Sequence, residues 1–175
     1  MFNYCPSCAS DKITFKEGKV FRCPDCNFVY YHNIAAATGC LIIVPADGEE
    51  TDDKLVFLVR GKEPAAGKLD LPGGFVDIGE GVIEGLCREL YEEIGWKPPV
   101  QPQLFASFSN VYEYKGFKYN TCDMYFLVLA PGLKPEDLCL EQSEIAAVRF
   151  LKPNEINFDD FAFSSTAQAV KKYLD

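Results

Sequence analysis

One segment of this 175-residue chain has apolar residues at a helical period. Over residues 81–94, Val82, Leu86, Leu90 and Ile94 recur every four positions, which predicts one apolar helix face. Gly95 follows directly, and glycine is common just after the last turn of a helix. We therefore predict an amphipathic helix over 81–94 whose apolar face packs on a sheet.

Short apolar runs bounded by turn residues predict strands in much of the remaining chain. They cover residues 37–44, 55–60, 104–112, 118–130 and 146–151. The first two runs flank an acidic, exposed turn at 46–53 and are expected to form a hairpin. Residues 163–175 predict a terminal helix, with Ser165 and Gln168 spaced as in a capping box. Strands with interspersed helices predict an α/β sandwich.

The composition is that of a soluble globular protein, with 48% hydrophobic and 25% charged residues. The length allows one full core with a small appendage. The first residues, MFNYCPSC, lack the basic segment and apolar run of a signal peptide. Apolar runs are also shorter than the roughly 18 residues that a membrane helix needs. We therefore expect a cytoplasmic protein without a membrane span.

The formal net charge of −9 limits the class of partner. Binding to a nucleic-acid backbone needs a basic surface, so no nucleic-acid partner is expected. A small phosphorylated substrate remains compatible with this charge, because a bound divalent metal can reverse the local field.

Four of the eight cysteines form two C-x2-C pairs, Cys5 with Cys8 and Cys23 with Cys26. The runs ITF and VFR lie between the pairs around a turn at 17–19, which suits a hairpin that brings the pairs together. Four thiolates at one point suit a structural Zn²⁺ ion, with iron as the lesser alternative. Two disulfides or a redox C-x2-C are the other readings, disfavoured by a cytosolic setting and by the duplication. His32 is expected at the surface.

Three glutamates of the predicted helix, Glu89, Glu92 and Glu93, lie three or four residues apart or side by side. Their carboxylates are therefore neighbours on one edge of the helix. A solvated acidic face is the usual meaning of such a cluster. Here Gly73 and Gly74 precede the helix and allow the backbone to approach a ligand closely. Clustered carboxylates bind hard cations such as Mg²⁺, so this region is a candidate site for a metal-bound pyrophosphate.

The segment 74–96 also resembles the Nudix box, G-x5-E-x7-R-E-U-x-E-E-x-G-U, where U is a bulky apolar residue. Its defined positions are occupied by Gly74, Glu80, Arg88, Glu89, Leu90, Glu92, Glu93 and Gly95. Trp96 stands at the last position, where an aliphatic residue is more usual. The resemblance covers about residues 35–175. It implies the Nudix α/β/α sandwich with a mixed sheet.

The resemblance also implies roles for the box residues. Glu89, Glu92 and Glu93 would hold Mg²⁺ or Mn²⁺, and a backbone carbonyl near Gly73 or Gly74 would complete the coordination. Arg88 would orient a glutamate through a charge-assisted hydrogen bond. Glu80 would be a further metal ligand or act from the second sphere.

The general base is less well defined by the resemblance. In Nudix enzymes it is a box glutamate or an acid on a later loop. Glu141 and Glu144 are the loop candidates here. Ordinary surface charge before a strand explains these two residues equally well.

A zinc ribbon over residues 1–34 followed by a Nudix domain over 35–175 resembles the NADH pyrophosphatase group. The SQPWPFPxS-like motif of that group is missing, and the matching region reads SFSNVYEYKGFKYNTCDMYF. The resemblance implies a metal-dependent hydrolase that cleaves the diphosphate of ADP-ribose, a nucleotide sugar or NADH. The alternative is a non-catalytic Nudix sensor that regulates a partner through its ribbon. A homodimer is compatible with the family but is not specified by the residues.

Overall fold

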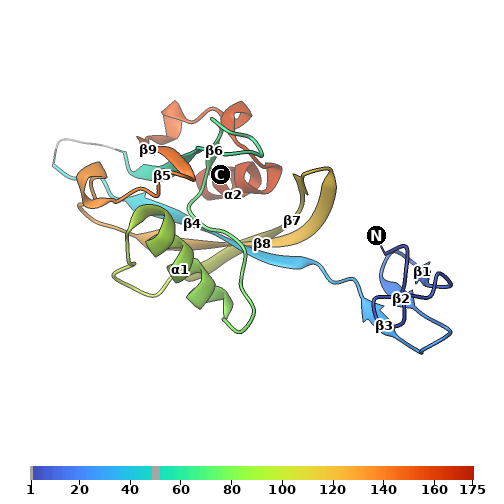
Figure 1. Ribbon diagram of the computed structural model, residues 1–175. Coiled ribbons are helices and arrows are strands. Elements are labelled where there is room, and N and C mark those ends of the chain that lie inside the picture. The colour runs from blue at the N-terminus through green and yellow to red at the C-terminus, as the bar shows by residue number, and fades with distance from the viewer. Residues whose placement is uncertain (1, 49–51) are drawn as a thin grey trace. The chain divides into compact units, whose positions relative to one another are not determined.

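The computed structural model describes residues 2–48 and 52–175. The chain divides into two compact units, Met1–Ile34 and Ala35–Asp175 (Figure 1). Part of the predicted acidic turn at 46–53, residues 49–51, lies outside the described residues. Over the described ranges, no helix has the length and apolar character needed to cross a membrane.

The first unit is a small antiparallel sheet with a Cys cluster beside it. Its strands are β1 (Thr14–Lys16), β2 (Val20–Arg22) and β3 (Val29–Tyr31), in the order β1-β2-β3. The predicted hairpin corresponds to β1 and β2, whereas β3 was not predicted because all three of its residues are exposed and show no alternation. The buried Phe21 stacks on Phe15 with ring centroids 4.1 Å apart. The unit therefore has a core of only a few side chains.

The second unit is a six-stranded sheet with a helix on each face. The strand order is β6-β5-β4-β8-β7, and β9 pairs with β5. The β4–β8 pair is parallel and the others are antiparallel, so the sheet is mixed. The strands are β4 (Ala35–Val44), β5 (Lys54–Arg60), β6 (Leu69–Asp70), β7 (Gln103–Tyr114), β8 (Phe117–Leu129) and β9 (Ile145–Leu151).

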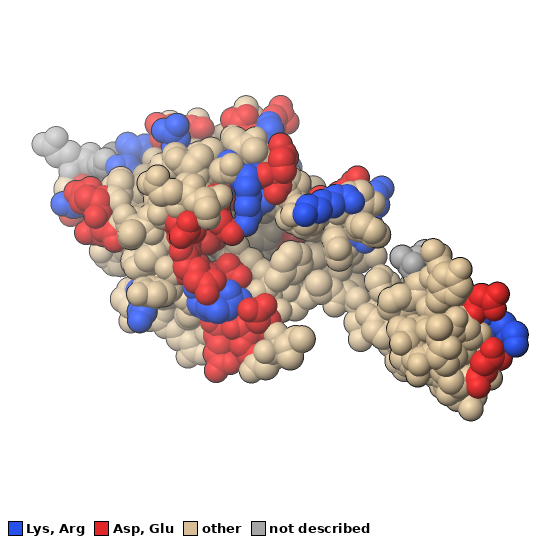
Figure 2. Space-filling view, viewed as in Figure 1, with Lys and Arg blue, Asp and Glu red and all other residues tan. Residues whose placement is uncertain are grey.

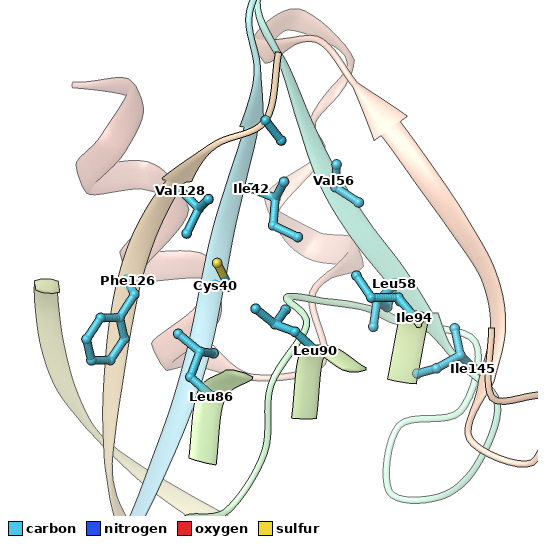
Figure 3. Close-up of a cluster of buried hydrophobic side chains, with 11 residues drawn as sticks. Cys40, Ile42, Val56, Leu58, Leu86, Leu90, Ile94, Phe126, Val128 and Ile145 are labelled. Carbon is cyan, nitrogen blue, oxygen red and sulfur yellow. The ribbon is translucent and has the colours of Figure 1, made fainter. Parts of the chain in front are cut away.

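Helix α1 (Val82–Ile94) packs on one face of the sheet. Leu86, Leu90 and Ile94 are fully buried and point toward the strands (Figure 3). They meet alternate residues of β4, among them Cys40 and Ile42, as expected for side chains on one face of a strand. Gly95 ends the helix in the left-handed conformation at φ 64°, as its sequence position predicted.

Helix α2 (Ser164–Leu174) covers the opposite face (Figure 1). Its Ala169 and Val170 pack on a second cluster that includes Leu41 and Phe57, the residues of β4 and β5 that point away from α1. The predicted α/β/α sandwich with a mixed sheet is confirmed. Three short 3₁₀ turns complete the unit at Pro135–Asp137, Pro153–Glu155 and Phe158–Asp160.

The capping box predicted for α2 is wrong. The residue before the helix is Phe163, and no side chain caps it. Ser165 lies inside the first turn and donates its hydroxyl to Asp123 Oδ2 at 2.6 Å, while the Gln168 side chain donates to the Ser164 carbonyl. A buried tertiary partner for Ser165 therefore replaces the local capping interaction.

Strands β4 and β5 are paired only at Ile43 with Leu55 and at Val44 with Lys54. Nearer its beginning, β4 pairs instead with the segment 72–76, which leads into α1. Thr38 donates its backbone N–H to the Gly74 carbonyl, and Cys40 donates to the Pro72 carbonyl, both at 2.8 Å. This pairing fixes segment 72–76, called the glycine loop here, beside β4 and shortly before α1.

Candidate active site

Glu93 connects α1 to the glycine loop. Its Oε2 accepts a hydrogen bond of 2.8 Å from the Gly73 N–H. Burial raises the pKa of this carboxyl to about 8 despite that bond, and the negative charges of Glu89, Asp70 and Glu144 add to the rise. Glu93 is thus a part-buried acid whose titration is influenced by three other carboxylates.

Glu89 lies one turn earlier and packs directly on Gly74. A Cβ built at position 74 would come within 2.5 Å of the Glu89 carboxyl carbon, so only glycine leaves this carboxylate in place. Gly73 is restricted differently, because its φ is 143° and a Cβ there would lie 2.2 Å from the Thr38 carbonyl oxygen. Burial raises the pKa of Glu89, while the adjacent Arg88 lowers it.

Arg88 joins three of the box carboxylates, those of Glu80, Glu89 and Glu92. Its Nη2 and Nε donate to the two oxygens of Glu80 at 2.7 and 3.1 Å, and its Nη1 donates to Glu89 and Glu92, each at 2.9 Å. The planar guanidinium provides several donors in fixed directions, which a lysine lacks. Arg88 also donates to the Phe75 carbonyl and so ties the glycine loop to the helix.

A cavity of about 270 Å³ opens beside these residues. Figure 2 shows acidic side chains, with basic ones among them, over the region of α1. The cavity is lined by residues from the glycine loop, α1, β4, β7, β8 and the segment before β9. Its charged lining residues are Arg60, Lys62, Asp70, Asp77, Arg88, Glu89, Glu93, Asp123 and Glu144.

The candidate residues from the sequence divide into two groups. Gly73, Gly74, Arg88, Glu89, Glu93 and Glu144 line the cavity. The others do not. Both carboxylate oxygens of Glu80 accept hydrogen bonds from Arg88. Glu92 and Glu141 line an adjoining groove. Glu141 Oε1 accepts from the Ser143 backbone and hydroxyl, which lowers its pKa.

Several cavity residues, among them Arg60 and Asp70, were not recognised in the sequence. Asp70 accepts a hydrogen bond of 3.0 Å from Arg60, and burial raises its pKa although Arg60 and Thr166 oppose this. Lys62 forms an ion pair with Glu144. The sequence signal was weak, because Arg60 ends a predicted strand and Asp70 lies outside the predicted strands and helices. The cavity therefore has cations placed between its carboxylates.

The four cysteines of the first unit form a separate cluster. Cys5 Sγ lies 3.6 Å from Cys26 Sγ, and Cys8 Sγ lies 3.7 Å from Cys23 Sγ. All four sulfur atoms lie within 4.8 Å of one another. Sulfur ligands of a tetrahedral zinc ion, with bonds of about 2.3 Å, are roughly 3.8 Å apart. The cluster is therefore compatible with zinc, and the exposed His32 is not part of it.

Comparison with known families identifies the second unit. A model of the NUDIX domain matches residues 34–172. The chain belongs to the NUDIX domain family. The glycine loop, Arg88 and the helix glutamates described above are thus the residues of a Nudix box.

Curated Nudix relatives match over part of their length. A protein of Methanocaldococcus jannaschii named ADP-ribose pyrophosphatase is 37% identical over 76 residues, which cover 43% of this chain and 40% of that protein. A protein of Chromobacterium violaceum named NAD-capped RNA hydrolase NudC is 31% identical over 94 residues, or 54% of this chain and 32% of that protein. The matched stretches thus span less than half of either relative.

Solved structures support the Nudix fold. A NUDIX hydrolase from Nitrosomonas europaea has a TM-score of 0.69 and 24% identity, and the match covers 99% of this chain and 90% of the other. The NUDIX domain of Shewanella oneidensis NrtR, crystallised with ADP ribose, has a TM-score of 0.65 and 15% identity over 83% of this chain and 91% of that one. At these identities the likeness concerns the fold alone.

Proposed function

We propose that this chain is a Mg²⁺- or Mn²⁺-dependent hydrolase that cleaves the diphosphate of a nucleoside diphosphate derivative. The observation that carries the proposal is the convergence of Glu89, Glu93, Glu144 and Asp70 at one cavity. The pKa of Glu93 is raised first by desolvation and further by the charges of the other three. Part-buried acids that repel one another in this way favour a bound cation. The relative named ADP-ribose pyrophosphatase supports the same class of reaction.

The donor set fits a hard divalent cation, because its free atoms are carboxylate oxygens. Glu89 and Glu93 would hold the ion, and Glu92 would contribute from the neighbouring groove. Bound there, the ion would neutralise the diphosphate and acidify a water molecule. Arg88 holds Glu89 in position through its bond of 2.9 Å. Glu80 acts through Arg88, since both of its oxygens accept from that side chain.

Glu144 is the better of the two general-base candidates. It lines the cavity, and its charge acts on both Glu89 and Glu93. Glu141 instead accepts from Ser143 at the protein surface. Glu144 would accept the proton of the attacking water, and Lys62, its ion-pair partner, would then be released toward the phosphate charge.

We expect Glu144→Gln to lower kcat by roughly 10²–10⁴-fold, the usual contribution of a general base. Glu141→Gln is the matched control, because it makes the same change three residues away outside the cavity, and its kcat should stay within about threefold of the wild type. Steady-state rates at saturating Mg²⁺ would measure both effects. Equal losses in the two variants would remove Glu144 from this role.

The substrate range follows less directly from the structure. ADP-ribose or a nucleotide sugar should be cleaved at least as well as NADH, because the motif of the NADH pyrophosphatase group is missing. The products would be a nucleoside monophosphate and a phosphorylated second moiety. A panel of these compounds with Mg²⁺, read by kcat/KM and by mass spectrometry of the products in ¹⁸O-labelled water, tests this expectation.

Two results of the panel would contradict the proposal. A clear preference for NADH would show that the missing motif does not set specificity. Nucleotide binding without Mg²⁺-dependent turnover would favour the alternative, a non-catalytic Nudix sensor.

For the first unit we propose a zinc ribbon over residues 1–34 with a structural Zn²⁺ ion held by Cys5, Cys8, Cys23 and Cys26. The sulfur separations support tetrahedral coordination. The unit has few buried side chains, so a metal would supply folding free energy that its core lacks. The Nudix domain would then occupy residues 35–175.

A further inference from the structure

The cavity has a second polar region on strand β8, formed by Thr121 and Asp123. These residues are two positions apart, so their side chains lie on the same face of the strand. Both line the cavity. Both are also deeply buried, with 3% of Thr121 and 8% of Asp123 exposed. Neither residue belongs to the Nudix box.

The hydroxyl oxygen of Thr121 and one carboxylate oxygen of Asp123 have no hydrogen-bond partner among the described residues. They are Thr121 Oγ1 and Asp123 Oδ1. A buried polar atom without a partner costs about 1–3 kcal/mol, and native proteins contain few of them. Two such atoms on one face of a strand, both at a cavity, indicate a ligand that bonds to them.

The other oxygen of Asp123 is firmly held. Ser165 of α2 donates to Asp123 Oδ2 at 2.6 Å, and Tyr125 donates to Ser165 at 3.0 Å. All three side chains are buried. This chain of bonds fixes the carboxylate and leaves Oδ1 as an acceptor for a donor in the cavity.

Strand β4 leaves space beside these oxygens. It runs parallel to β8, with Ala37 opposite Asp123 and Gly39 opposite Tyr125. A Cβ at position 39 would lie 2.8 Å from the Tyr125 ring. The small residues therefore allow Tyr125 to reach Ser165. On the other side, Asn110 of β7 is paired with Thr121 and also lines the cavity.

The polar region lies close to the carboxylates of the Nudix box. Thr166, the residue after Ser165, donates to Asp70 at 3.0 Å. Asp70 in turn raises the pKa of Glu93. In a nucleoside diphosphate derivative, the group directly attached to the diphosphate is a sugar. The sugar is thus the part of the substrate expected beside the box in the same cavity.

The aromatic side chains of the cavity suit a different part of the substrate. Phe75 meets the Tyr112 ring at 5.5 Å, and Tyr112 meets Phe163 at 5.6 Å. Such surfaces favour a planar base by stacking. A sugar hydroxyl, in contrast, can donate to a carboxylate and exchange a hydrogen bond with a threonine hydroxyl.

We propose that Thr121 and Asp123 bind the hydroxyl groups of a sugar attached to the diphosphate and so select substrates that carry those hydroxyls. This inference rests on the proposed hydrolase function. It assigns the two residues to specificity and leaves the chemical step to the box residues.

The test uses the full chain with Mg²⁺ and the variants Asp123→Asn and Thr121→Val. Both replacements keep the side-chain size and change one cavity-facing group. Cys122→Ala, on the same strand with its side chain on the opposite face, is the control. The substrates are ADP-ribose, two analogues that each lack the hydroxyls of one ribose, and an analogue without the adenine amino group.

We expect the wild type to prefer ADP-ribose over at least one deoxygenated analogue by tenfold or more in kcat/KM. Asp123→Asn should lower kcat/KM for ADP-ribose at least tenfold but change that for the deoxygenated analogue less than threefold. Thr121→Val should act in the same direction with a smaller effect. Cys122→Ala should leave the ratio unchanged.

Three outcomes would overturn the assignment. The variants could retain the wild-type ratio, they could weaken all substrates equally, or they could remove discrimination of the adenine amino group instead. If the wild type turns over none of the compounds, the hydrolase proposal fails independently. Calorimetric binding of the same compounds then decides the matter, and equal affinities of wild type and Asp123→Asn for ADP-ribose would also overturn the assignment.

Discussion

Glu93→Gln should stabilise the metal-free protein while it lowers turnover by orders of magnitude. The folded-state pKa of Glu93 is about 8, raised first by burial and then by neighbouring carboxylates. In the unfolded chain a glutamate titrates near 4.3. Because the folded-state pKa is raised, the contribution of protonated Glu93 to the free energy of unfolding is complete below about pH 4.3. This contribution is lost as the pH rises through 8. Glutamine removes this loss.

Thermal unfolding in a chelator from pH 5 to pH 9 would measure the effect. At pH 8 and above, Glu93→Gln should gain roughly 1–3 kcal/mol over the wild type, and its stability should fall less with pH. Glutamine can still accept the hydrogen bond from Gly73, so the loop should keep its place. Glu136→Gln is the control, because it makes the same change at an exposed glutamate that is distant in sequence from Glu93. It should change the free energy of unfolding by less than about 0.5 kcal/mol.

The same variant tests the chemistry. With saturating Mg²⁺, its kcat should be lower than that of the wild type by orders of magnitude, because one charged ligand is gone. A destabilised Glu93→Gln at pH 8, or one with near-normal rates, would contradict the role of Glu93 at a metal site.

The second large effect concerns the ribbon. Purified protein should contain one zinc ion per chain, and Cys5→Ser should release it. Structural zinc contributes on the order of 10 kcal/mol to small domains, so residues 2–34 should then lose their fold. Hydrogen exchange should rise in this unit and stay nearly constant in residues 52–175.

Cys139→Ser provides the matched control, because Cys139 is exposed and outside the cluster. Elemental analysis under reducing conditions and hydrogen exchange with mass spectrometry are the measurements. If iron is found in place of zinc, the four-cysteine metal site is retained and only the identity of its metal changes. Metal-free protein with full protection in residues 2–34 would refute the metal centre.

Local patterns in the sequence were sufficient for the framework of the fold. The four-residue apolar repeat predicted α1, and Gly95 marked its end. Alternation and turn residues predicted the long strands. These signals succeed because burial of one face determines the period of a helix or strand. The paired cysteines likewise predicted a cluster, since a C-x2-C turn brings two sulfur atoms together.

Features that depend on distant contacts were not predictable in this way. Ser165 was read as a cap because its spacing fits, but Asp123, 42 residues earlier, is its partner. Thr121 and Asp123 lie on a strand whose apolar neighbours suggested ordinary packing. Asp70 lies outside every strand and helix that the sequence predicted. The pairing of β4 with β8 on one side and with segment 72–76 on the other helps to bring these residues to one cavity.

The two loop glycines are constrained by independent requirements. Gly73 is needed for folding, since its backbone angle and its approach to Thr38 exclude any side chain. Gly74 is needed for the proposed chemistry, because a side chain there would meet the flexible end of Glu89 and displace a carboxylate without breaking the strand. If the proposed function holds, a change at Gly74 alone could therefore convert this domain from a catalyst to a binder. A substitution at Gly73 would first require a different backbone path beside Thr38.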